Sequence, residues 1–144
     1  MKRWLLGGLV LFATSALAVP NKVVTLGPVI LSATLTTNIF SPPTTTGGTG
    51  KPENVLNTFY LIKHCRITNK TGSAATASFW KGASAGNVAG TEVIAQGTSV
   101  PANSYIDWYG NLRLDSGDTN LFLVGGAGTG SALTLTCEAE MGIS

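Results

Sequence analysis

The sequence is poor in charge, in histidine and in cysteine. Charged residues make up 11% of the 144 residues, against about 25% in an average protein, so hydroxyl and amide groups supply most of the polar surface. The basic residues do not cluster in any one stretch, which argues against a nucleic-acid partner. One histidine and two cysteines are too few for the common tetrahedral zinc sites, and we expect no metal or other cofactor.

Helical periodicity is missing as well. Beyond residue 20, no segment has apolar residues at helical spacing over three turns. Short alternating runs appear instead, and residues 133–141 (LTLTCEAEM) show the pattern most clearly, because every second side chain is apolar. With turn signals about every 8 to 12 residues, the sequence predicts an all-β fold, a single antiparallel β-sandwich, jelly-roll-like, with about seven or eight strands.

Several local features give the expected strand plan. Residues 21–40 predict two β pieces divided by Gly27-Pro28, and residues 125–131 (GGAGTGS) predict a turn. We expect residues 58–69 and 75–81 to pair as a hairpin, because a short turn around Gly72 separates them. Further strands are expected at 91–95, 105–114, 121–124 and 133–141.

The first 18 residues form a signal-like leader. Residues 1–18 have a basic start, an apolar run, and small residues Ala16 and Ala18 before the expected cleavage site. The apolar run is too short for a stable membrane anchor, which needs about 20 residues. Residues 19–144 are therefore expected to form the single domain.

Two segments are predicted as arms that contact neighbouring subunits. Residues 41–57 begin with SPPTTTGGTGKPEN, which has three prolines, three glycines and hardly any apolar side chain. Long loops in small domains are usually functional or disordered. Together with an extended N-terminal arm at 19–28, this loop is expected to order against another subunit. Deletion of 41–54 is then expected to leave a folded monomer that no longer assembles.

Cys65 and Cys137 lie 72 positions apart, and their state depends on the compartment. In an exported protein they are expected to form a single disulfide. In a reducing cytoplasm they would remain two buried thiols that pack as small hydrophobic side chains. The sequence leaves both alternatives open.

The titratable residues do not form a catalytic pattern. His64 neighbours Cys65, so on a strand the two side chains point to opposite faces and cannot act as a thiolate–imidazole pair. Glu138 and Glu140 alternate along the polar face of the last strand. No G-x-S-x-G motif accompanies the serines. The sequence predicts a protein that is not an enzyme.

Four aromatic residues lie close to predicted turns: Trp80, Tyr105, Trp108 and Tyr109. Exposed together, they would form a glycan-contacting platform or the centre of a protein interface. Buried, they would fill the core. Strand alternation places Tyr105, Asp107 and Tyr109 on one face and Trp108 on the other.

The phrases at residues 21–48, 61–94, 107–118 and 122–142 together resemble small structural proteins of tailed bacteriophages. The resemblance covers about residues 20–143 and implies an all-β domain that contributes contacts to a symmetric assembly. It implies a virion protein that decorates or cements the capsid, or a tail or adaptor component. The implied partners are copies of itself, with a trimer as the expected form, and other virion proteins such as the major capsid protein.

The leader supports a different function. Phage structural proteins normally assemble in the cytoplasm, whereas a cleaved signal would export the protein to the periplasm or the medium. The alternative function is therefore an exported carbohydrate-binding module that uses Trp80, Trp108 and Tyr109.

Overall fold

The computed structural model describes residues 21–43, 57–86 and 91–143. The leader at 1–18 and most of the predicted arm at 41–57 lie outside the described residues. The described residues form eight strands: β1 (Lys22–Ile30), β2 (Thr37–Phe40), β3 (Thr58–Asn69), β4 (Ala75–Gly82), β5 (Glu92–Val100), β6 (Ser104–Asp115), β7 (Phe122–Ala127) and β8 (Leu133–Ile143). The described part of the chain has no helix that could cross a membrane.

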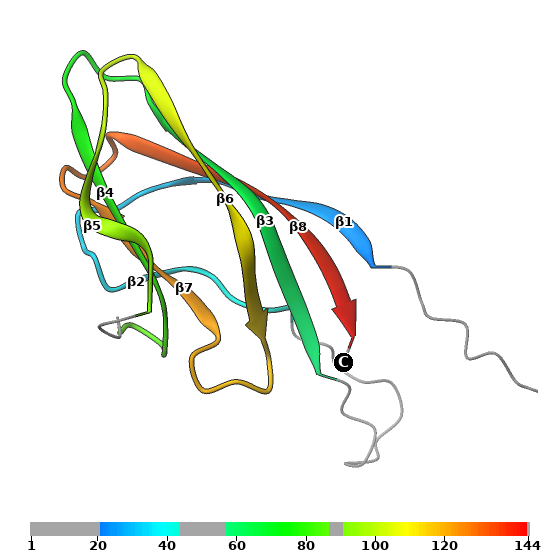
Figure 1. Ribbon diagram of the computed structural model, residues 1–144. Coiled ribbons are helices and arrows are strands. Elements are labelled where there is room, and N and C mark those ends of the chain that lie inside the picture. Colours follow the sequence, from blue (N-terminus) through cyan, green and yellow to red (C-terminus); the bar gives the residue numbers. More distant parts are fainter. Residues whose placement is uncertain (1–20, 44–56, 87–90, 144) are drawn as a thin grey trace, which may run out of the picture.

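The strands form two antiparallel sheets of four. The first sheet has the order β1-β8-β3-β6 and the second has the order β2-β7-β4-β5 (Figure 1). Strands from the first half of the chain pair with strands from the second half, and only β4 and β5 are both consecutive and paired. This is the strand order of a jelly roll. The predicted β-sandwich is confirmed.

The core lies between the inner faces of the two sheets. The alternation of the last strand is confirmed, because Leu133, Leu135, Cys137 and Ala139 of β8 are all buried. The second sheet contributes buried side chains that include Phe79 of β4. Each large apolar side chain that leaves water contributes about 1.5–3 kcal/mol, so this alternation fixes which face of β8 points inward.

The expected hairpin between residues 58–69 and 75–81 is wrong. β3 pairs with β6 and β8 in the first sheet, whereas β4 pairs with β5 and β7 in the second. Both strands bury apolar side chains in the same core, so they face each other across it instead of lying side by side. Asn69 stabilises the crossing, because its Nδ2 donates to the carbonyls of Ser73 and Val100 at 2.9 and 3.0 Å.

The predicted N-terminal arm at 19–28 is wrong from Lys22 onward, because these residues belong to β1, which pairs with β8 within the first sheet. The strand also runs through Gly27-Pro28 with a shift in register between Leu26 and Val29, so the predicted division is wrong. β1 ends at Ile30, whereas the second of the two predicted β pieces was expected to continue beyond that residue.

Residues 125–127 belong to β7 and not to the predicted turn. Gly125 lies against the backbone of β4, where a Cβ atom would overlap the carbonyl oxygen of Ser78. Here glycine serves close packing of the backbone, which looks the same in the sequence as a glycine-rich turn. Residues 91–95 likewise extend into the longer β5, which continues through Gly97 to Val100.

Candidate functional site

The outer face of the first sheet carries a cluster of charged and aromatic side chains. We define the outer-face cluster as His64 and Arg66 of β3, Tyr105, Asp107 and Tyr109 of β6, and Glu138 of β8. The strand register brings these residues together, since Arg66 lies opposite Asp107, and His64 lies opposite both Tyr109 and Glu138. The predicted shared face of the three β6 residues is consistent with this arrangement.

Asp107 connects the two β3 side chains of the cluster. Its Oδ1 lies 2.8 Å from Nε of Arg66 and 3.0 Å from Nε2 of His64, and its Oδ2 accepts from Nη2 of Arg66 at 3.0 Å. The hydrogen bonds from Arg66, followed by that from His64, lower the pKa of Asp107 to about 2. Asp107 is thus a carboxylate whose charge is largely matched by Arg66.

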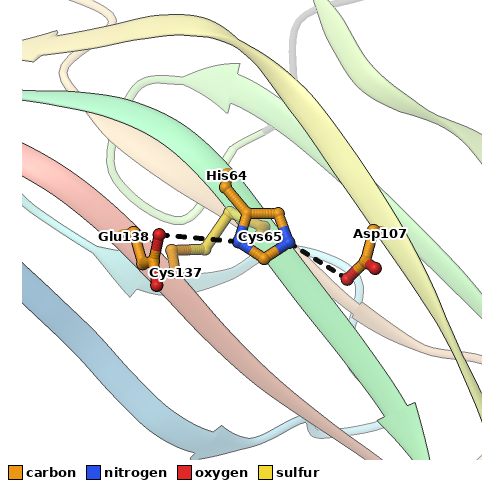
Figure 2. The surroundings of a disulfide bond; sticks show 5 residues. All are labelled: His64, Cys65, Asp107, Cys137 and Glu138. Carbon is orange, nitrogen blue, oxygen red and sulfur yellow. Dashed lines mark hydrogen bonds and ion pairs between the residues drawn. A yellow bond between two sulfur atoms is a disulfide. The ribbon is translucent and has the colours of Figure 1, made fainter.

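His64 lies between two carboxylates that come from neighbouring strands. Its Nε2 faces Asp107, and its Nδ1 lies 3.8 Å from Oε2 of Glu138 (Figure 2). The other side of the sheet at this point holds the disulfide between Cys65 and Cys137. His64 and Cys65 point to opposite faces, as the alternation predicts.

The two tyrosines of the cluster are fixed on one side and exposed elsewhere. The ring of Tyr109 stacks on the ring of His64, with the centroids 4.7 Å apart and the planes 18° apart. The guanidinium of Arg66 lies 4.0 Å from the ring centre of Tyr105, in a cation–π contact. Tyr105 and Tyr109 nevertheless remain 51% and 72% exposed.

The four aromatic residues singled out from the sequence do not share one surface. Trp80 is only 2% exposed and lies on the face of β4 opposite Phe79, where it pairs with Val124. Trp108 points inward beside the core and lines a groove of about 390 Å³ together with residues of β4, β5 and β6. Only Tyr105 and Tyr109 stand on the same open face.

Comparison of the chain with protein-family models, with curated protein sequences and with solved structures gives no match. The chemistry of the surface therefore has to be inferred from its own geometry. Within the described residues, no three His, Cys, Asp or Glu side chains are placed to hold a metal ion.

The sequence did not predict that His64 and Arg66 contact the exposed tyrosines of β6. Both stand on alternate positions of β3, and that spacing shows that they share a face. Their contact with β6 depends on the strand register over a separation of more than 40 residues. The available signal was a pair of polar residues at alternate positions of β3, on either side of the buried Cys65.

A second surface of interest is the β1 edge, defined here as residues 22–30. Among the described strands, β1 pairs only with β8, so its other side is free. Val23 and Ile30 are 74% and 67% exposed. Such an edge presents unpaired backbone N–H and C=O groups next to apolar side chains, which is the usual chemistry of strand addition.

Proposed function

We propose that this protein is a non-enzymatic structural subunit of a tailed-phage virion. In this proposal it decorates or cements the capsid, or acts as a tail or adaptor component. It does so through contacts with copies of itself and with other virion proteins such as the major capsid protein. The resemblance of residues 20–143 to phage structural proteins supports a place in the virion. The β1 edge supports assembly through contacts between subunits.

The exposed apolar residues of β1 carry the proposal. Val23 and Ile30 both lie on the outer face of an edge strand, where a second chain can cover them while it pairs with the backbone. Each such side chain contributes about 1.5–3 kcal/mol when it is fully buried. A cyclic trimer is the form we expect, in which β1 of one copy contacts a different surface of the next copy.

Pro28 limits how far a partner can pair with this edge. Proline has no backbone N–H, and the register of β1 shifts between Leu26 and Val29. The regular part of the edge is therefore residues 22–26. A short regular edge favours a closed contact between subunits over open-ended strand addition.

The fold supports the proposal by analogy alone. Jelly-roll sandwiches are common in viral capsid proteins and also in lectins, and a fold does not specify a function. The disulfide between Cys65 and Cys137 suits a particle that acts outside the cell, because such bonds persist in oxidising surroundings.

Light scattering of the purified full chain tests the assembly. We expect the wild type to elute as a defined oligomer and the variant Val23→Asp/Ile30→Asp to elute as a folded monomer. The matched control is Gln96→Asp/Ser99→Asp, which places two charges at exposed positions of β5, one of the two edge strands of the second sheet. A monomeric wild type, or an oligomer that survives both charges on β1, contradicts the proposal.

Intact mass of the native protein tests the location. A chain that retains Met1 and is recovered from purified phage particles supports the virion setting. A chain that begins at Val19 and is found only in the periplasm or the medium contradicts that setting.

A further inference from the structure

The exposed tyrosines of the outer-face cluster are arranged as a preorganised pair. His64 covers one face of the Tyr109 ring, with the ring centroids 4.7 Å apart. The guanidinium of Arg66 covers one face of the Tyr105 ring, 4.0 Å from its centre. Asp107 hydrogen-bonds both the imidazole of His64 and the guanidinium of Arg66. The two tyrosine rings therefore lose little additional conformational freedom when a ligand binds. Less ordering on binding leaves more of the contact energy as affinity.

The spacing of the rings fits an extended ligand. Tyr105 and Tyr109 are four residues apart on one strand and face the same side, so their Cα atoms are about 14 Å apart at the rise of a β-strand. A ligand that consists of one ring is too short for such a separation. A chain-like ligand that follows β6 can do so.

The groups between and beside the rings can form hydrogen bonds. Asp107 and Arg66 lie between them, and Thr68 of β3 lies opposite Tyr105. Tyr105 also borders an open hollow of about 230 Å³ that Asn103 and Ser104 help to line. An aromatic face with hydroxyl, amide and charged groups around it complements a pyranose ring, which has an apolar C–H face and a rim of hydroxyl groups.

The charge of the cluster favours a neutral ligand. The positive charge of Arg66 is matched by Asp107 through two hydrogen bonds. Glu138 and Glu140 add negative charge on the adjacent strand β8. Phosphate-bearing chains such as single-stranded nucleic acid bind through uncompensated basic groups. The one basic group of the cluster is already paired, whereas Lys70 borders the hollow beside Tyr105, so anionic probes belong in the test.

A protein partner fits this surface less well than the β1 edge. The neighbours of the rings across the sheet are polar, and Arg66 lies between Asp107 and Thr136 of the flanking strands. Protein interfaces are enriched in Tyr and Arg but depleted of Asp and Glu. At this cluster the ion pair of Arg66 and Asp107 lies between the two rings.

We propose that the outer-face cluster binds a neutral oligosaccharide along β6. Tyr105 and Tyr109 stack against two sugar rings of one chain, and the polar groups between them bind the hydroxyl groups of the sugars. The inference does not depend on the assembly proposal, since β1 and β6 form the two opposite edges of the same sheet, with β8 and β3 between them (Figure 1).

Binding of the full chain to an array of neutral and anionic oligosaccharides tests the inference, followed by calorimetric titration of the best neutral probe and of its monosaccharide. We expect the longer probe to bind more tightly than the monosaccharide. Tyr105→Ala/Tyr109→Ala should weaken binding about a hundredfold, if each ring accounts for about a factor of ten. Tyr105→Phe/Tyr109→Phe keeps both rings and should stay within about threefold of the wild type.

Two controls make the loss interpretable. Val23→Ala/Ile30→Ala removes exposed apolar groups from the far edge of the sheet and should not change sugar binding. Thermal melting should show that the alanine variant at the tyrosines is folded, because both side chains are largely exposed.

Several results overturn the inference. One is a wild type that binds no neutral probe, and another is a double alanine variant that binds as tightly as the wild type. Tyrosine-dependent binding of an oligo-dT strand in place of sugars would assign the rings to nucleic acid. A fall in oligomer mass in the alanine variant, without any sugar binding by the wild type, would assign them to a protein interface.

Discussion

Cys65 of β3 and Cys137 of β8 lie directly opposite each other, and a disulfide joins them across 72 residues of sequence. Both are buried on the inner face of the first sheet. The bond links the two central strands of that sheet, one from each half of the chain. It therefore stabilises the pairing on which the jelly roll depends.

Removal of this disulfide should destabilise the protein without changing its fold. Closing a loop of 72 residues restricts the unfolded chain, and a bond of this kind typically contributes about 2–4 kcal/mol. Urea unfolding of the wild type with and without reductant measures the loss. Cys65→Ala/Cys137→Ala should match the reduced protein, and an unchanged midpoint in both would contradict the expectation.

Acid should weaken the fold through Asp107. Its pKa falls from the ordinary 3.8 to about 2 because Arg66 and His64 hydrogen-bond the carboxylate. A lowered pKa in the folded state means that the stabilisation is present above the unfolded pKa and is lost as pH falls through 3.8 toward 2. Melting temperatures measured across this range should fall more steeply for the wild type than for Asp107→Asn.

Asp115 provides the comparison for this acid effect. The backbone N–H of Gly117, followed by Arg113, lowers the pKa of Asp115 as well. Asp115→Asn should therefore remove a separate part of the acid sensitivity. If neither asparagine variant flattens the pH profile, the hydrogen bonds to these carboxylates do not stabilise the folded state.

Gly125 should not tolerate a side chain. A Cβ atom there would overlap the carbonyl oxygen of Ser78 and lie 2.8 Å from Cδ1 of Phe79. We expect Gly125→Ala to cost about 1–3 kcal/mol, because the backbones of β4 and β7 would have to separate. Gly72→Ala is the control, since a Cβ atom at Gly72 meets nothing within 4 Å. Equal unfolding midpoints for the two variants would contradict the close packing.

Asn69 should be the most sensitive polar residue of the turn region. Its side chain donates to two carbonyls and accepts at 2.9 Å from the backbone N–H of Thr71, while only 1% of the residue is exposed. Asn69→Ala should cost about 1–3 kcal/mol, because it removes the hydrogen bond that the side chain donates to the carbonyl of the buried Val100. Asn111→Ala removes an exposed contact to Lys63 and should change the unfolding free energy by about 0.5 kcal/mol at most.

The local pattern of the sequence was sufficient to predict which way side chains point. The period of two in β8 places Cys137 inward and Glu138 outward, and the same rule separates His64 from Cys65. For β6 it predicted the shared face of Tyr105, Asp107 and Tyr109, which are half of the six residues of the candidate site. These predictions hold because side chains alternate between the two faces of a strand wherever no bulge interrupts it, whatever the strand pairs with.

The pattern failed where glycine or tryptophan had two possible roles. The glycines at 125 and 126 suggested a turn but lie within β7, because their missing side chains make room for β4 and for the chain at Ser32 and Thr34. For Trp80 the sequence left burial and exposure both open, and the residue is buried on the outer face of the second sheet. Neither outcome is encoded in the neighbouring residues.

The sequence by itself determined the all-β class, the inward and outward faces along β6 and β8, the opposite faces of His64 and Cys65, and a surface rich in hydroxyl groups. Only the tertiary structure decided which strands are neighbours, because jelly-roll pairing joins residues that are far apart along the chain. His64 and Asp107 meet across 43 positions through the register of β3 and β6. Alternation is a property of one strand, whereas register results from packing the whole core, so the faces were predictable and the site was not.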